Sequence, residues 1–304
     1  MLTLRRRGFA RAGLSLLVGV ALLAPASAFA VPSGDDDDGA GSRQYYVNLG
    51  DSYAAGVQVT DDGLRATDEG YAEQIVPRAR RRGYRLELVN FGCGGASTSS
   101  ILDAPGCGAP AVAGEPYDGK AQAVAAADFL REHRGDVALV TVTIGGYDVT
   151  ACAASPDPIG CVTQAVVAIQ TNVGQLARDL RDAAGPDVPI VGLTYPDVIL
   201  GQWVRPPVNQ AFAELSVVAF ESFINPTLEA AYDEGAGTFI DVTEETGAYG
   251  SLERTTELAP YGTIPVPVAR VCRLTYYCEL GDIHARTAGY RAIAKLVVAT
   301  LPRV

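Results

Sequence analysis

The stretch Leu49-Gly50-Asp51-Ser52-Tyr53-Ala54-Ala55-Gly56 directly follows a short apolar run, Tyr45–Leu49. That run predicts a β-strand. A serine placed where a strand enters a glycine-punctuated turn can be held at the edge of a sheet with its hydroxyl exposed, as a nucleophile requires. Glycine, aspartate and serine are also ordinary turn residues, so the stretch alone is equally typical of a turn without chemistry. The remainder of the chain favours the nucleophile.

Short β-branched runs alternate with helical patterns along the chain. We predict strands at Gln44–Leu49, Arg85–Phe91, Val137–Ile144, Pro189–Leu193 and Thr238–Val242. We predict helices at Tyr71–Arg82, Ala121–Arg134, Cys161–Ala184, Asn209–Glu234 with an interruption at Pro226, and about Thr287–Leu301. This alternation indicates an α/β fold in which a parallel sheet carries helices on both faces.

Residues 1–30 have the features of a secretory signal peptide. A basic head precedes the apolar run Leu14–Leu23, and small residues lead up to Ala30, after which we expect cleavage. The run Arg6-Arg7-Gly8-Phe9 also resembles a twin-arginine signal, so the export route stays open. Residues 31–43, with the acidic run Asp35–Asp38, predict a disordered linker, and residues 44–304 a single domain. We therefore expect a secreted protein without a transmembrane segment.

The acidic balance of the chain excludes some partners. The formal net charge is −11, and removal of the signal peptide takes it to about −15. Nucleic acid binding requires a basic footprint, so we expect no nucleic acid partner. The same charge argues against electrostatic attachment to anionic lipid. We expect a monomer that uses no metal or organic cofactor, and we favour a solubilising role for the aspartate run over a calcium site.

Six cysteines in an exported chain predict disulfides. Six cysteines allow fifteen pairings in principle. Their spacing suggests that neighbours pair: Cys93 with Cys107, Cys152 with Cys161, and Cys272 with Cys278. A zinc site is the alternative, but the chain has no Cys-x-x-Cys pair and its two histidines lie far from such pairs.

Ligands of parallel α/β sheets bind beyond the carboxyl ends of the strands. The second predicted strand is followed by Gly92-Cys93-Gly94-Gly95-Ala96, whose glycines could turn N–H groups toward a developing oxyanion. The third is followed by Gly145-Gly146-Tyr147-Asp148, and Gly281-Asp282-Ile283-His284 precedes the last helix. A flexible glycine turn is the simpler explanation of each segment taken alone.

Only one of the two histidines is positioned to serve Ser52. His133 ends a helix and precedes a strand, so we expect it at the opposite edge of the sheet as a solvated surface residue. His284 is then the only imidazole that could act as a base for Ser52. A carboxylate beside it could orient the ring and stabilise the imidazolium.

These four segments, in this order, resemble the SGNH hydrolases, also called the GDSL lipase/esterase family. The resemblance covers nearly the whole mature chain and implies a three-layer α/β/α, flavodoxin-like fold with a parallel five-stranded sheet. It implies that Ser52 is the nucleophile, that His284 is the base, and that the N–H groups of Ser52 and Gly95 form the oxyanion hole. The sequential cysteine pairs and the arginine-rich, lysine-poor composition are similar to the secreted actinobacterial lipase branch.

Two positions depart from the family pattern. The family has Gly-x-Asn-Asp in its third block, where the asparagine donates to the oxyanion, but this chain has Tyr147. A phenol can donate a hydrogen bond, although it is longer than an amide. The family spacing Asp-x-x-His would place an aspartate at position 281, which is Gly281 here. We take Asp282 as the residue that orients His284, with a backbone carbonyl near Gly281 as the alternative.

The sequence therefore predicts a secreted serine esterase or lipase that hydrolyses acyl esters of lipids or small molecules through an acyl-enzyme on Ser52. A carbohydrate acetyl esterase of the same mechanism is one alternative. A weakly active or non-catalytic binding protein on the same fold, suggested by Tyr147, is another. Three residues after the fourth strand are candidates for an acyl pocket: Tyr195, Leu200 and Trp203.

Overall fold

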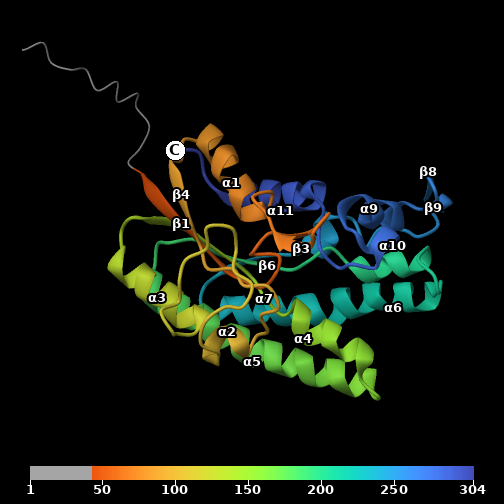
Figure 1. The fold of residues 1–304 in the computed structure, drawn as a ribbon, viewed down its shortest axis with the longest axis horizontal. Helices are drawn as coiled ribbons and strands as arrows, with labels where there is room; N and C mark the ends of the chain where they lie inside the picture. Colours follow the sequence, from red (N-terminus) through yellow and green to blue (C-terminus); the bar gives the residue numbers. More distant parts are fainter. Residues whose placement is uncertain (1–42) are drawn as a thin grey trace, which may run out of the picture. The chain divides into compact units, whose positions relative to one another are not determined.

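A five-stranded parallel sheet lies at the centre of residues 43–304, the part of the chain that the computed structural model describes. Its strand order is β4-β1-β5-β6-β7 (Figure 1). The strands are β1 Gln44–Gly50, β4 Leu86–Asn90, β5 Val137–Thr143, β6 Ile190–Leu193 and β7 Thr238–Ile240. The predicted α/β fold with this sheet is confirmed. The predicted signal peptide and linker, residues 1–42, lie outside the described residues.

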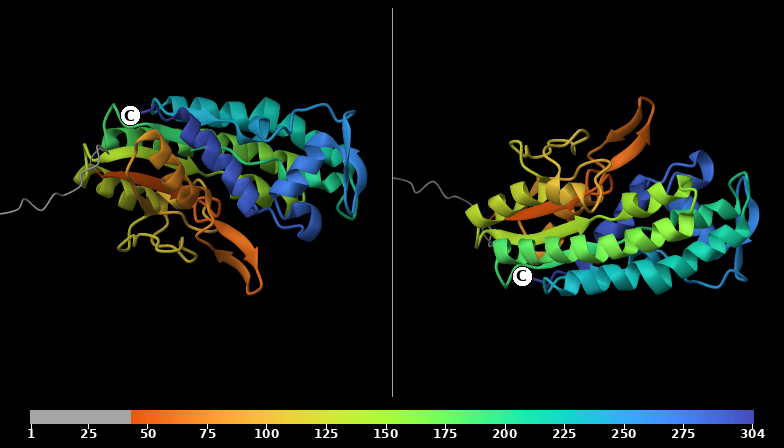
Figure 2. Two further views of the ribbon diagram at one scale, coloured as in Figure 1. Left: turned by 90° about the horizontal axis from the view of Figure 1, so that it is seen from above. Right: turned by 90° about the horizontal axis from the view of Figure 1, so that it is seen from below.

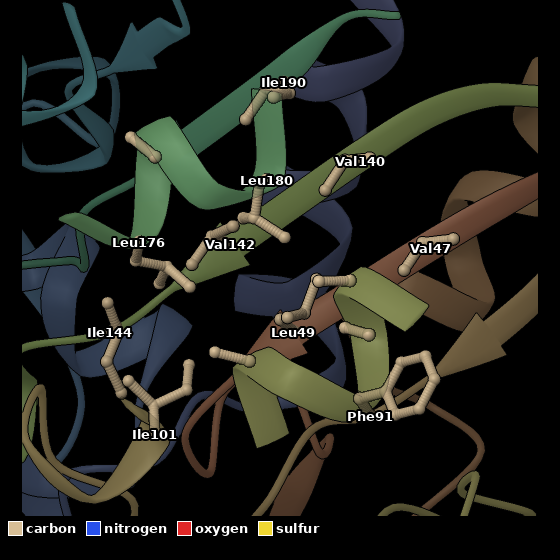
Figure 3. Packing of buried hydrophobic residues seen from close by; sticks show 14 of the residues in the cluster. Val47, Leu49, Phe91, Ile101, Val140, Val142, Ile144, Leu176, Leu180 and Ile190 are labelled. Carbon is tan, nitrogen blue, oxygen red and sulfur yellow. The ribbon is translucent and has the colours of Figure 1, made fainter. Parts of the chain in front are cut away.

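Alternate residues of the strands face two separate hydrophobic cores, and Figure 3 shows the one that contains Val47 and Val140. Val47 and Val140 point to one face, whereas Tyr46 and Leu139 point to the other, as the two-residue period of a strand requires. All seven residues of β5 are buried, because helices cover the central strand on both sides.

Two helix layers complete the sandwich (Figure 2). One face packs against α1 Tyr71–Ala79 and α11 Thr287–Thr300. The other packs against α3 Gln122–Glu132, α5 Pro158–Ala184 and α7 Asn225–Asp233. Among the described residues, no helix is both long and apolar enough to cross a membrane.

The long helix predicted at Asn209–Glu234 is divided as expected near Pro226. The structure has α6 Gln210–Ala219, a π-helical turn η4 Phe220–Ile224, and then α7, in whose first turn Pro226 lies. Proline has no N–H to donate to the preceding turn, so it is accommodated at the start of a helix rather than in its interior.

The segments beyond the carboxyl ends of the strands are more ordered than the turn-rich sequence predicts. A hairpin of β2 Val57–Thr60 and β3 Gly63–Ala66 projects from the body (Figure 2). A second hairpin joins β8 Thr255–Leu258 to β9 Gly262–Pro265. The short helices here are α2 Ser100–Asp103, α4 Gly146–Thr150, η2 Ala151–Ala154, η3 Val198–Trp203, α8 Val242–Glu245, α9 Val266–Leu274 and α10 Tyr277–Leu280, whereas η1 Arg80–Arg82 precedes β4 at the other edge of the sheet. Leu200, Ile264 and Val268 join a small core of their own.

All three predicted disulfides are present, with Cα–Cα distances of 5.8, 5.5 and 5.2 Å. Cys93–Cys107 closes the loop after β4, Cys152–Cys161 joins η2 to α5, and Cys272–Cys278 joins α9 to α10. Since all six cysteines are paired, none is a free thiolate ligand for zinc.

Candidate active site

Ser52 lies in the turn that ends β1. Gly50 has a φ of +131°, and a Cβ there would lie 1.9 Å from the carbonyl oxygen of Thr143 on β5, so only glycine fits. The Asp51 N–H donates to that same oxygen (2.9 Å), and the Val57 N–H donates to the carbonyl of Ser52 (2.9 Å). Asp51 and Tyr53 are buried, but Ser52 between them is only half-buried. The turn therefore leaves the serine as its accessible residue.

Asp282 contacts His284 through two hydrogen bonds. One carboxylate oxygen, Oδ1, lies 2.8 Å from Nδ1 of the ring and accepts the backbone N–H of His284 at 2.9 Å. Burial would raise the pKa of Asp282, but the hydrogen bonds from His284 hold it below its usual value. An Nδ1–H that donates to a carboxylate leaves Nε2 as the basic nitrogen. The shorter spacing of this chain thus still places a carboxylate on the ring.

Tyr53 connects the serine turn to the histidine loop. Its hydroxyl donates to the carbonyl of Ile283 (2.8 Å), and its ring is stacked near that of His284, with centroids 6.4 Å apart. Residues at the two ends of the described chain are thereby brought together. Within residues 43–304 the Ser52 hydroxyl makes no hydrogen bond to His284 or to any other group. Such catalytic bonds are often long without substrate and tighten when it binds.

A buried chain of hydrogen bonds joins three strand ends. Asp51, which is 4% exposed, accepts the N–H of Tyr53 (2.9 Å) and the hydroxyl of Tyr195 (2.6 Å). The Tyr195 hydroxyl in turn accepts the N–H of Gly146 (3.1 Å). Burial raises the pKa of Asp51 to about 6, although the hydrogen bond from Tyr195 opposes that rise. The loops after β1, β5 and β6 are therefore tied to one another.

The glycine loop after β4 lies next to the serine turn, because the Cys93 N–H donates to the carbonyl of Gly50 (3.0 Å). Gly95 has a φ of +82° and is exposed, and no atom lies within 4 Å of the place where its Cβ would be. Glycine is favoured there for its backbone conformation rather than for lack of space. Within the described chain, the N–H groups of Ser52 and Gly95 have no acceptor. Both are available to an incoming oxyanion.

Comparison with known proteins agrees with this geometry. The model of the GDSL-like lipase/acylhydrolase family matches residues 49–292. The chain belongs to this family. None of the curated proteins matches the chain.

Solved structures extend the comparison. The extracellular lipase of Streptomyces rimosus is 17% identical with a TM-score of 0.52, and the match covers 85% of this chain and 100% of that one. Phospholipase A1 of Streptomyces albidoflavus is 16% identical over 79% and 98% of the two chains, with a TM-score of 0.42. A carbohydrate acetylesterase family member of Sinorhizobium meliloti is 17% identical over 84% and 96%, with a TM-score of 0.44. The first of these shows that the fold is shared.

The missing third-block asparagine of this GDSL-family chain is not replaced by a nearby amide. The side-chain NH₂ of Asn48 donates to the Ala54 carbonyl (2.9 Å) and to Asn90 (2.8 Å). That of Asn90 donates to the same carbonyl (3.2 Å) and to Glu73 (3.1 Å). Both amides are buried and brace the back of the serine turn.

Tyr147 stands at the third-block position with its side chain 54% exposed. Within residues 43–304 its hydroxyl has no hydrogen-bond partner. Its neighbour Asp148 accepts the N–H (3.0 Å) and the hydroxyl (2.6 Å) of Thr98, which ties the third-block loop to the second-block loop. The backbone of Tyr147 is therefore fixed although its ring faces solvent.

The three pocket candidates occupy different environments. Trp203 is half-buried at the end of η3, but Leu200 is fully buried in the small core and supports η3 from within. Tyr195 is 9% exposed, and its hydroxyl is engaged with Asp51. The sequence offered no signal for that engagement, since 144 residues separate the two positions. Among the described residues, no cluster of three or more histidine, cysteine, aspartate or glutamate side chains could hold a metal.

His133 lies away from the site, as predicted. Its ring packs on Tyr45 and Phe129 at the amino end of β1, with centroids 4.6 and 4.2 Å apart. It is half-buried between aromatic rings rather than fully solvated, because α3 ends over the start of the sheet.

Proposed function

We propose that this protein is a serine esterase or lipase that hydrolyses acyl esters through an acyl-enzyme on Ser52. The observation that carries the proposal is the imidazole of His284, which Asp282 orients and which Tyr53 connects to the serine turn. Membership of the GDSL-like family supports an ester hydrolase in general terms. The residues named here supply the more specific mechanism.

In the first half of the proposed reaction, the Ser52 oxygen attacks the ester carbonyl carbon while Nε2 of His284 takes the hydroxyl proton. Asp282 stabilises the imidazolium that forms. The N–H groups of Ser52 and Gly95 hold the oxyanion, with the Tyr147 hydroxyl as a third donor. When the tetrahedral intermediate collapses, the alcohol leaves with the proton from His284 and the acyl group stays on Ser52.

The second half repeats these roles with water. His284 takes a proton from a water molecule, whose oxygen attacks the acyl carbon, and then returns the proton to the Ser52 oxygen as the carboxylic acid departs. Every proton passes through one imidazole, so the reaction requires no further acid or base.

The proposed enzyme is exported. Three disulfides support an oxidising compartment, in line with the secretory features of residues 1–30. Detection of the protein in the culture medium, with a mature amino terminus at residue 31, would test this proposal.

Hydrolysis of nitrophenyl acetate, butyrate and decanoate by the purified protein tests the catalytic proposal. We expect wild type to hydrolyse at least one of these esters and Ser52→Ala to lose that activity. Ser251→Ala removes an exposed hydroxyl elsewhere and serves as the control. Equal rates for wild type and Ser52→Ala would refute catalysis through Ser52. Activity confined to acetyl groups on carbohydrate would replace the acyl esterase with an acetyl esterase.

A further inference from the structure

A cationic hollow lies between the end of α1 and the second half of α11, two helices that pack side by side (Figure 1). It encloses about 320 Å³. Five cationic side chains line it, with Val298 and Ala299 as its apolar wall: Arg78, Arg81, Arg82, Lys295 and Arg303. It lies at the edge of the sheet where the strands begin, because η1 leads into β4. This is the opposite edge from Ser52, so the hollow is separate from the proposed catalytic site.

The positive charge of the hollow is not balanced locally. Within residues 43–304, none of the five lining side chains forms an ion pair with a carboxylate. α11 adds Arg291 and contains no acidic residue, whereas the whole chain carries a net charge of −11. Burial lowers the pKa of Arg78, and the neighbouring charges of Arg81 and Arg291 lower it further. Cations have therefore been gathered here on an otherwise acidic protein.

Some of these groups are held in place. Arg78 donates to the carbonyl of Gln74 at 2.6 Å, and Arg82 donates to that of Leu301. A guanidinium has five N–H donors, so each keeps further donors for a ligand after its backbone bond is made. Fixed donors lose less entropy when they bind than mobile ones do.

Helix polarity accounts for only part of the cluster. Cations are favoured near the negative end of a helix, and this explains arginines in the last turn of α1 and in η1. The effect is confined to about one turn. Arg291 and Lys295 lie further than that from the end of α11 at Thr300, so a different reason is needed for them.

We propose that this hollow binds a phosphate-bearing anion of more than one negative charge. Guanidinium groups match phosphate oxygens in planar, paired hydrogen bonds, and several such groups around one hollow suit a multivalent anion better than chloride. The phosphate belongs either to a soluble molecule or to a lipid headgroup. The site binds in either case without using Ser52 or His284.

Calorimetric titration of the full-length protein with inorganic pyrophosphate, at constant ionic strength in sodium chloride, tests the site. We expect saturable binding that Ser52→Ala leaves unchanged. The double variant Arg81→Gln/Lys295→Gln should weaken the apparent Kd about ten- to hundredfold, as expected for the loss of two charge-assisted hydrogen bonds. Both side chains are exposed, so the variant should keep the wild-type circular dichroism spectrum.

The control Arg65→Gln/Arg254→Gln removes two exposed cations elsewhere. Its Kd should stay within about twofold of wild type, since screened charges at a distance contribute little. An equal loss of affinity in the control would overturn the proposal, because net charge alone would then explain binding. Heat signals no larger than those of ionic-strength-matched chloride would overturn it as well.

Vesicles distinguish the two sources of phosphate. The hollow would be assigned to a lipid headgroup if the protein sediments with phosphatidylglycerol vesicles but not with phosphatidylcholine vesicles. Pyrophosphate should then prevent the sedimentation. Pyrophosphate binding without vesicle binding would assign it to a soluble phosphate. Absence of both would refute the site, whatever the esterase assay shows.

Discussion

Asp282 reaches His284 from a position one residue closer than the family spacing, and a single carboxylate oxygen accepts both the ring and the backbone N–H. We expect Asp282→Asn to lower kcat about 10²–10⁴-fold, because an amide at this place favours the wrong tautomer of the ring. Steady-state ester hydrolysis measures the effect. Glu279→Gln, which removes a nearby solvent-facing carboxylate, is the control. Near-normal activity of Asp282→Asn would show that a backbone carbonyl orients His284 instead.

The Tyr195 hydroxyl connects Asp51 to Gly146 and so positions the third-block loop against the serine turn. Tyr195→Phe leaves Asp51 with only the hydrogen bond from the Tyr53 N–H and removes the acceptor of the Gly146 N–H, and we expect kcat to fall about tenfold with little change in KM. Loss of the hydrogen bond also raises the pKa of Asp51 above about 6. The acid limb of the activity profile should then move to higher pH.

Tyr45→Phe is the matched control for that experiment, since Tyr45 packs among aromatic rings at the other end of β1. The charged groups that act on Asp51 are His284 and Asp148. Tyr195→Phe and Tyr45→Phe both retain these two residues, so a difference between their pH profiles reports on the Tyr195 hydroxyl. If Tyr195→Phe changes only KM, or leaves the pH profile in place, Tyr195 has no positioning role.

Tyr147 tests how the oxyanion is held without the family asparagine. We expect Tyr147→Phe to lower kcat about tenfold, less than the 10²–10³-fold typical of a buried donor, because the ring is largely exposed. Tyr147→Asn restores the family amide and should recover or exceed wild-type turnover. Kinetics of Tyr147→Phe that match wild type would leave a hole with two backbone donors.

At the scale of single elements, η3 begins over a buried carboxylate. Asp197 is fully buried, accepts the Ser216 hydroxyl (2.8 Å) and caps η3 through the Ile199 N–H (3.0 Å). Burial raises its pKa to about 7. A carboxyl whose pKa is raised on folding costs stability once it ionises, so this cost is absent near pH 4 and complete above about pH 7.

Asp197→Asn should therefore stabilise the protein at pH 8 by about 2–4 kcal/mol and have little effect at pH 4. An asparagine can still accept from Ile199 and can donate to the Ser216 oxygen. Urea unfolding at the two pH values measures the difference. A gain of the same size at both would mean that ionisation of Asp197 is not its cause.

The elements that the sequence predicted are those with a clear hydrophobic period. β5 is a continuous apolar run, and α11 repeats buried residues at Tyr290, Ile293, Ala294 and Val297, so both were placed within a few residues. The region between residues 244 and 281 lacks such a period. Its hairpin and its two helices are stabilised by Cys272–Cys278, which the cysteine spacing predicted, and by contacts in the small core that contains Leu200, which no local pattern encodes.

The candidate site also has a part that the sequence predicted and a part that it did not. Ser52 and His284 were predicted because parallel strands bring all their carboxyl ends to one edge. The contacts among Asp51, Tyr195 and Gly146 were not, since each partner lies after a different strand and carries no motif of its own. Tertiary hydrogen bonds between distant loops depend on the finished fold rather than on neighbouring residues.

At the scale of the whole molecule, net charge is a poor guide to local charge. An overall value of −11 argued against anionic partners, yet α1, η1 and α11 together carry the cationic hollow. Fields fall off within about one Debye length, roughly 8 Å at physiological salt, so a binding partner senses the nearest groups rather than the sum. The net charge therefore predicts repulsion of anionic partners at long range, but it does not predict how an anion interacts with the hollow at contact distance.

The hydrogen bond from Tyr53 to Ile283 spans 230 positions of the chain. During synthesis the nucleophile turn is made well before the residues that carry and orient its base. A partly translocated or truncated chain thus contains a serine with no imidazole to activate it. The proposed enzyme would acquire its activity only when both segments have been synthesised and have folded against each other, so the folding of the whole domain switches the esterase on.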